Sequence, residues 1–177
     1  MENIKIKDKE FKPLIDSARI QTRITELAIE LNSDLKGKNP LFLAILNGAF
    51  IFAADLMKGI SIDCEISFVK LASYKGTKSS GSVLTLIGLD EDVNDRNIII
   101  IEDIVDTGNT MTELLPKFNV FSPRSIKIAT MFFKPAALVN PIKPDYVGFE
   151  IGNEFIVGYG LDYEGLGRNL NDVFVAI

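Results

Sequence analysis

The chain of 177 residues contains no histidine and only one cysteine, Cys64. A single cysteine cannot form an internal disulfide, and without histidine a zinc site built from Cys and His ligands is excluded. The lack of histidine also removes the most common general base of enzymes. Any proton transfer that the protein catalyses must therefore fall to Asp, Glu, Lys or Tyr.

Long apolar runs are also missing, although 47% of the residues are hydrophobic, which indicates a folded globular chain. No run approaches the ~20 residues needed to span a bilayer. Residues 1–8 alternate charged and apolar side chains and lack the apolar core of a signal peptide, so we expect a cytoplasmic protein with no membrane partner. The net charge of −5 argues against broad nucleic-acid binding, although it leaves room for a local basic pocket.

The most informative segment is residues 98–112. Four consecutive isoleucines, residues 98–101, predict a strand buried on both faces of a parallel sheet, because β-branched side chains disfavour a helix. Glu102 and Asp103 follow directly, and a small polar turn at 106–110 comes next. Thr110 and the glutamate three residues later have the spacing of a capping box, so we expect a helix to begin near Thr110.

This arrangement predicts an anion-binding site at the 106–110 turn. Free backbone N–H groups and the helix dipole favour an anion such as phosphate at a helix N-terminus. Ligands of open α/β sheets also bind beyond the carboxyl ends of strands, where the turn and the two preceding acids would lie. Acids in such a place can instead cap the next helix or face solvent. A cap needs one polar side chain, however, and this segment offers several.

A second strand, turn and helix precede this segment. Residues 41–46 are an apolar run that predicts a buried strand, the turn at 47–49 contains Gly48, and a helix is expected over 50–58. This turn is either a second anion-binding turn or a tight connection that simply needs glycine.

A longer helix is expected over 17–35, with its apolar residues on one face and with Ser17 as N-cap and Gly37 as stop signal. Arg23 lies off the apolar face, so its side chain is expected to be solvated or to lie at a subunit contact. The preceding lead-in, residues 8–15, is interpreted as an edge strand or an arm.

The remaining apolar runs predict further strands at 62–72, 83–89, 125–133, 146–150, 155–159 and 172–177. The small polar linker at 73–82 is either a hairpin tip or a mobile lid that closes over a reacting site. Lys134, at the end of one strand, either points into the site or lies at the surface. Because no repeat or long linker divides the chain, we expect one α/β domain over 1–177, with a hood formed by the lead-in and about 134–177.

The segment at 98–112 resembles the phosphoribosyl-diphosphate (PRPP) binding motif of type I phosphoribosyltransferases: a hydrophobic strand, two acids, and then Asp-Thr-Gly-x-Thr. Within this family, nearly the whole chain is similar to the hypoxanthine (hypoxanthine–guanine) phosphoribosyltransferases. The segment at 46–56 resembles their pyrophosphate loop and following helix, and Ser73 and Tyr74 resemble the start of their catalytic lid. The segments at 143–151 and 155–163 resemble their purine-recognising hood.

The resemblance implies a mainly parallel central sheet flanked by helices, with a small hood of loops and short strands. It also implies a purine-salvage enzyme that uses Mg²⁺ to transfer ribose 5-phosphate from PRPP to hypoxanthine, and to guanine, giving IMP or GMP and pyrophosphate. A homodimer or homotetramer is expected.

Relatives often carry lysine where this chain has Asn47, and some have a cis peptide in that loop. The missing charge implies greater reliance on Mg²⁺, Arg168 or the lid.

The resemblance also implies a role for each candidate site residue. Glu102 and Asp103 would accept the ribose hydroxyls, near a second Mg²⁺ bound through those hydroxyls. The 106–110 turn would bind the 5′-phosphate, and Asp106 would also take the proton of the purine N7. Pyrophosphate would be held by Asn47, Gly48 and Arg168. The full set is Glu102, Asp103, Asp106, Thr107, Gly108, Asn109 and Thr110 for PRPP, Asn47, Gly48 and Arg168 for pyrophosphate, Lys134, Phe155, Ile156 and Asp162 for the purine, with Asp162 also the direct Mg²⁺ ligand.

Two other functions share parts of this pattern. A regulator with the same fold would sense nucleotides and bind RNA through a basic face, which the acidic balance of this chain opposes. A receiver-like nucleotide-binding domain also has acids after a strand, but it has no hood. Lys134, Phe155 and Asp162, which all stand at matching places, favour the enzyme.

Overall fold

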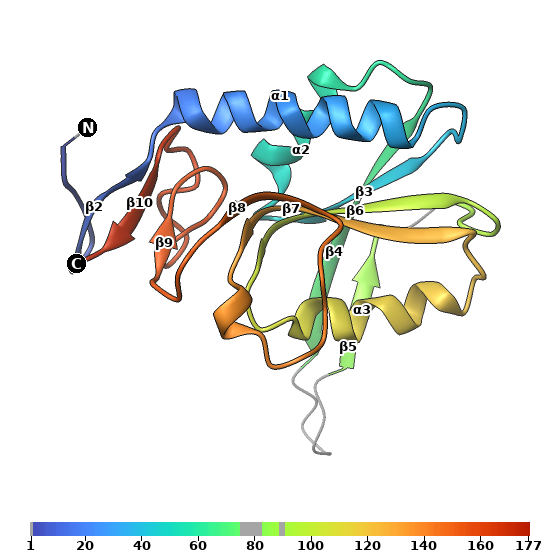
Figure 1. Ribbon diagram of the computed structural model, residues 1–177. Helices are drawn as coiled ribbons and strands as arrows, with labels where there is room; N and C mark the ends of the chain where they lie inside the picture. The colour runs from blue at the N-terminus through green and yellow to red at the C-terminus, as the bar shows by residue number, and fades with distance from the viewer. Residues whose placement is uncertain (1, 75–82, 89–90) are drawn as a thin grey trace.

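The computed structural model describes residues 2–74, 83–88 and 91–177 of the chain. Its largest element is a six-stranded sheet in the order β5-β4-β3-β6-β7-β8 (Figure 1). All neighbouring strands are parallel except β4 and β5, so the predicted mainly parallel sheet is confirmed. The strands are β3 (Leu41–Leu46), β4 (Glu65–Tyr74), β5 (Val83–Ile87), β6 (Asn97–Val105), β7 (Ser125–Phe133) and β8 (Tyr146–Glu150).

Helices cover both faces of this sheet. The helices α1 (Ser17–Asp34) and α2 (Phe50–Gly59) pack on one face, and α3 (Asn109–Asn119) packs on the other (Figure 1). The two central strands are therefore buried on both sides, which is why their sequences are apolar without alternation. The side chains of Phe42 and Ala44 belong to the core under α1 and α2, whereas those of Leu41 and Leu43 belong to the core under α3.

The helix starts differ in detail from the predictions. The first helix begins at Ser17, but its N-cap is Asp16, whose Oδ1 accepts a hydrogen bond of 2.8 Å from the backbone N of Arg19. The predicted capping box at Thr110 is also wrong, because α3 begins at Asn109 and its N-cap is Gly108, with no side-chain capping bond. Gly108 has a φ of 78°, a left-handed conformation that favours glycine. The chain therefore enters α3 by a backbone turn, without a side-chain cap.

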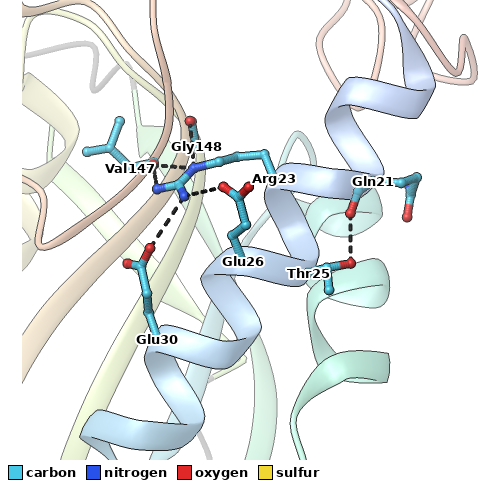
Figure 2. Close-up of polar contacts among 7 residues, drawn as sticks. All are labelled: Gln21, Arg23, Thr25, Glu26, Glu30, Val147 and Gly148. Atoms are coloured by element: carbon cyan, nitrogen blue, oxygen red, sulfur yellow. Dashed lines mark hydrogen bonds and ion pairs between the residues drawn. The ribbon is translucent and has the colours of Figure 1, made fainter.

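Arg23 was expected to be solvated or to lie at a subunit contact, but its guanidinium lies between α1 and β8 of the same chain (Figure 2). Its Nη2 donates to the carbonyl of Val147 at 2.8 Å, and its Nε donates to the carbonyl of Gly148 at 3.0 Å. Nη1 pairs with the carboxylates of Glu26 and Glu30. These bonds tie α1 to β8, the edge strand of the sheet, through two carbonyl groups of that strand.

A second, antiparallel sheet, here called the hood sheet, lies at one end of the molecule beside both chain termini (Figure 1). Its strands are β1 (Ile4–Ile6), β2 (Lys9–Ile15), β10 (Val173–Ala176) and β9 (Ile156–Val157), in that spatial order. The lead-in is thus an inner strand, and neither an edge strand nor an arm. Its proline is accommodated because the pairing of β2 with β10 shifts register between Val173 and Phe174, opposite Pro13.

The connection from β7 to β8 contains one short 3₁₀ helix, η1 (Pro135–Ala137). None of the helices in the described part of the chain is long and apolar enough to cross a membrane.

Candidate active site

The polar turn at 106–110 lies between the carboxyl end of β6 and the N-terminus of α3, as the sequence predicts. The carboxylate of Asp106 accepts a hydrogen bond from the backbone N of Thr107, and the hydroxyl of Thr107 accepts one of 3.4 Å from the backbone N of Asn109. A small pocket next to this turn is lined by Glu102, Ile104, Val105, Asp106, Gly108, Thr110 and Met111. The turn therefore combines a helix N-terminus with two threonine hydroxyls, which suits a phosphate group.

The turn is held from outside by Asn140, a residue that the sequence analysis missed. The carbonyl of Thr107 accepts bonds from the backbone N of Val139 at 3.2 Å and from that of Asn140 at 3.3 Å. The Asn140 side chain donates to the same carbonyl at 3.3 Å and to the side-chain oxygen of Asn109 at 2.7 Å. No local pattern could have indicated this role, because Asn140 lies 31 residues from Asn109 in the sequence.

The two adjacent acids differ in environment although they are neighbours on β6. Glu102 is buried, and its Oε2 has no hydrogen-bond partner among the residues that the structure describes. Burial, and then the negative charge of Asp103, raise the pKa of Glu102 well above its usual range. Burial also raises the pKa of Asp103, an effect opposed by hydrogen bonding to Glu102 and to the backbone N of Ile104 and by the charge of Arg168. A buried carboxyl oxygen without a partner suits a ligand that brings its own hydroxyl groups.

The loop at 46–49 packs directly against this acid pair. A Cβ on Gly48 would lie only 1.5 Å from Oδ2 of Asp103, so no residue other than glycine fits without a shift. Glycine is thus required because two segments of the site approach each other closely, and not only because the turn is tight. The Leu46–Asn47 peptide is cis, as the resemblance implies, and the Asn47 side chain is exposed.

The segment at 158–168 completes this side of the site by packing on the 46–49 loop. A Cβ on Gly160 would lie 2.1 Å from the carbonyl oxygen of Gly48. Arg168 Nη1 donates to the carbonyl of Gly160 at 2.7 Å, and its Nη2 pairs with the carboxylate of Asp162. The structure therefore brings together Asp162, Arg168, Gly48 and Asp103, which the sequence places in three separate segments.

On the other side of the site, Lys134 continues from β7 next to the end of β6. Its backbone N donates to the carbonyl of Val105 at 2.9 Å, and its side chain, only 8% exposed, donates to the carbonyl of Glu154 at 2.9 Å. Of the two alternatives for this lysine, the surface position is wrong. A buried ammonium group with one backbone partner still has two further protons to donate.

At the edge of the hood sheet, Phe155 contributes an aromatic ring and Ile156 contributes backbone groups. The Phe155 ring is 44% exposed and lies edge-on to Tyr163, with ring centroids 5.9 Å apart. The carbonyl of Phe155 accepts a bond from Ala176 in β10, so the next residue, Ile156, lies in a non-hydrogen-bonded pair. Because β9 is an edge strand, the backbone N–H and C=O of Ile156 point away from the sheet and are available to a ligand.

Two parts of the predicted site remain, the lid and the metal ligands. Ser73 and Tyr74 end β4, and the rest of the predicted lid, 75–82, lies outside the described residues. Within the described residues, no cluster of three or more Asp, Glu or Cys side chains could hold a metal by itself. Asp162 would suit an ion that takes most of its other ligands from substrate and water, as Mg²⁺ does. Glu102 and Asp103 would lie near a second such ion, bound through the ribose hydroxyls.

The chain is similar to known proteins over most of its length. The family model of the phosphoribosyl transferase domain matches residues 14–164. The hypoxanthine-guanine phosphoribosyltransferase of Streptococcus thermophilus is 44% identical over 165 residues, which cover 92% of each chain. That of Bacillus subtilis is 44% identical over 160 residues, covering 90% of this chain and 89% of the relative. A crystal structure of a hypoxanthine-guanine phosphoribosyltransferase from Bacillus anthracis superimposes with a TM-score of 0.87 at 34% identity, covering 96% of this chain and all of that one.

Proposed function

The chain belongs to the phosphoribosyltransferase family, and from this premise we propose that it transfers ribose 5-phosphate from PRPP to hypoxanthine, and to guanine. The main support for this proposal is that four parts of the chain lie together around the end of β6. They are the 106–110 turn, the acid pair, the Gly48 loop with its 158–168 cover, and the buried ammonium of Lys134. Each element matches one part of the two substrates.

The phosphoribosyl part of PRPP would occupy the turn and the acid pair. Backbone N–H groups at the start of α3, with the hydroxyls of Thr107 and Thr110, would bind the 5′-phosphate. The ribose hydroxyls would bond to Glu102 and Asp103, and the partnerless oxygen of Glu102 supports this assignment. Such bonds fix the ribose and present its anomeric carbon to the base.

The pyrophosphate would lie between the Gly48 loop and Arg168. Backbone groups of the loop and the guanidinium, which has five N–H donors, would bind the phosphoryl oxygens. Mg²⁺ bound to Asp162 and to substrate oxygens would neutralise the charge of the leaving group. Asn47 brings no charge to this place, so pyrophosphate binding would rely more on Mg²⁺, Arg168 or the lid.

The purine would lie between Lys134 and the hood sheet. Lys134 would donate to the 6-oxo group, a contact that favours hypoxanthine and guanine and disfavours adenine, whose 6-amino group is itself a donor. Phe155 would stack on the ring, and the outward-facing backbone of Ile156 would meet its pyrimidine edge. As the bond to pyrophosphate breaks, the purine nitrogen attacks an oxocarbenium-like anomeric carbon, and Asp106 takes the proton from N7.

The Asp106→Asn variant tests this assignment. The amide keeps the size of the carboxylate but cannot accept the proton, so PRPP affinity measured by calorimetry should persist while kcat falls by about 10²- to 10⁴-fold. Asp92→Asn, an exposed acid before the opposite end of β6, is the matched control and should keep wild-type turnover. An unchanged kcat in Asp106→Asn would refute the general-base role, and a wild-type protein without nucleotide formation would refute the proposed function.

A further inference from the structure

A hydrogen-bonded pair, made of a buried tyrosine and a partly buried aspartate, joins two segments of the site without belonging to its reacting groups. The hydroxyl of Tyr159 donates to Oδ2 of Asp55 in α2 at 2.8 Å, and the Tyr159 side chain is buried. The two residues are 104 positions apart in the sequence. Neither residue belongs to the groups that would contact the two substrates.

The backbone around Tyr159 is unusual. Tyr159 has a φ of 47° and lies between Gly158, with a φ of 104°, and Gly160, with a φ of 96°. A residue with a bulky side chain rarely adopts a left-handed conformation unless its surroundings hold it there. Here the backbone N of Tyr159 donates to the carbonyl of Leu170 at 2.9 Å, and the hydroxyl bond to Asp55 fixes the other end of the residue.

Two further side chains hold the Asp55 carboxylate in place. Oδ2 also accepts from the Gln21 side chain at 2.8 Å, and Oδ1 accepts from Lys58 at 2.7 Å. Although burial opposes ionisation, the bonds from Lys58, Gln21 and Tyr159 lower the pKa of Asp55. The carboxylate is therefore ionised at neutral pH, and the bond from Tyr159 is charge-assisted and stronger than a neutral one.

The position of the pair connects it to the pyrophosphate half of the site. The helix of Asp55 follows directly from the 46–49 loop, with the backbone N of Ala53 donating to the carbonyl of Ala49 at 2.8 Å. Tyr159 is followed at once by Gly160, which packs on the carbonyl of Gly48. The Tyr159–Asp55 bond and the Gly160–Gly48 contact thus join the same two segments at two places.

We propose that Asp55 and Tyr159 are a positioning pair that holds the segment of Asp162 and Arg168 in register with the 46–49 loop, and so sets the affinity for pyrophosphate and PRPP. The pair acts through Gly160 and touches no substrate. This inference rests on the proposed function, since it assigns pyrophosphate to the space between these two segments. Lys134 and the 106–110 turn lie on other segments, so binding of the purine and of the 5′-phosphate should not depend on the pair.

Tyr159→Phe tests the proposal because it removes only the hydroxyl. Loss of a hydrogen bond to a charged group corresponds to about a tenfold or greater change in affinity, so the Kd for Mg²⁺–pyrophosphate, measured by calorimetry without a purine, should rise about tenfold. The KM for PRPP should rise by a similar factor, with an unchanged KM for hypoxanthine. Asp55→Asn keeps an acceptor for the tyrosine hydroxyl and should have a smaller effect than Asp55→Leu.

Tyr146→Phe is the matched control. Its hydroxyl donates to Oδ2 of Asp34 at 2.9 Å, so it breaks the same kind of pair between β8 and α1, away from the site. This variant should lose thermal stability and keep the wild-type Kd for Mg²⁺–pyrophosphate. If Tyr159→Phe also keeps that Kd while the wild type turns over hypoxanthine, the positioning role is refuted and the proposed function stands. If the wild type binds Mg²⁺–pyrophosphate but forms no nucleotide, the proposed function fails. The Kd values of the wild type and of Tyr159→Phe for Mg²⁺–pyrophosphate still decide the role of the pair.

Discussion

Replacing Lys134 by methionine should weaken the reaction of 6-oxopurines selectively. The lysine is only 8% exposed, and its ammonium has a single bond in the described structure, to the carbonyl of Glu154 at 2.9 Å. Methionine has a similar length but no donor, so the 6-oxo group of the purine would be buried without its charged partner. The proposed site therefore loses one hydrogen bond to a charged group.

The size of this loss follows from the chemistry of the contact. A hydrogen bond to a charged group contributes about 1.5–3 kcal/mol, and each 1.4 kcal/mol is about a factor of ten, so kcat/KM for hypoxanthine should fall by about 10- to 100-fold. The KM for PRPP should not change, because the phosphoribosyl groups are assigned to other residues. The ratio of the rates with hypoxanthine and adenine should shrink by about the same factor.

The assay is initial-rate nucleotide formation at varied hypoxanthine and at varied adenine. Lys127→Met is a suitable control, because Lys127 lies near the start of β7, the strand that Lys134 follows, and donates to the hydroxyl of Tyr146 at 3.1 Å. This variant should keep the wild-type kcat/KM. If Lys134→Met also keeps the wild-type kcat/KM and base preference, the assignment of the 6-oxo group to Lys134 is refuted.

Four further variants test other parts of the account. Gly48→Ala places a Cβ 1.5 Å from the Asp103 carboxylate and should lower kcat/KM for PRPP by about 10²-fold, as ångström-scale misplacements do; a normal value would contradict the close approach. Because burial raises the pKa of Glu102 above 4.5, the folded state keeps this proton longer than the unfolded state does, and stability falls as pH rises beyond 4.5. Glu102→Gln should therefore raise Tm relative to wild type more at pH 8 than at pH 4, and the opposite trend would refute the pKa direction. Asn140→Ala removes neutral bonds to the 106–110 turn and should weaken PRPP binding about 3- to 10-fold in calorimetry; an unchanged Kd would show that the turn holds its shape alone. Arg23→Met should lower the free energy of unfolding by about 1.5–3 kcal/mol with unchanged kcat, and full stability in denaturant would contradict the role of its bonds to β8.

The sheet could be predicted from the sequence because its strands are continuous apolar runs. The predicted bounds 41–46, 125–133 and 146–150 are those of β3, β7 and β8. Burial on both faces leaves no polar residue inside β3, so the run and the strand have the same ends. Helix starts were predicted less well, since Asp16 and Ser17 are both good caps and only the three-dimensional path decides which side chain meets the free N–H groups.

Contacts between distant segments could not be predicted. Arg23 was expected in solvent or at a subunit contact because it lies off the apolar face of its helix, yet its partners Val147 and Gly148 lie 124 and 125 residues further on. The bonds of Asn140 to the 106–110 turn and of Tyr159 to Asp55 are of the same kind. The candidate reacting groups could be proposed from the sequence because they stand in motifs that resemble those of a known family, whereas the residues that hold them are defined only by the fold.

The most direct test of the proposed transfer of ribose 5-phosphate to a purine is to measure nucleotide formation from PRPP and Mg²⁺ with hypoxanthine, guanine, xanthine and adenine in turn. The account predicts rapid formation of a nucleotide with a 6-oxopurine and none with adenine, because the buried Lys134 can only donate. The absence of product from every base would contradict the proposed enzyme, and adenine turnover equal to that of hypoxanthine would contradict the purine site described around Lys134.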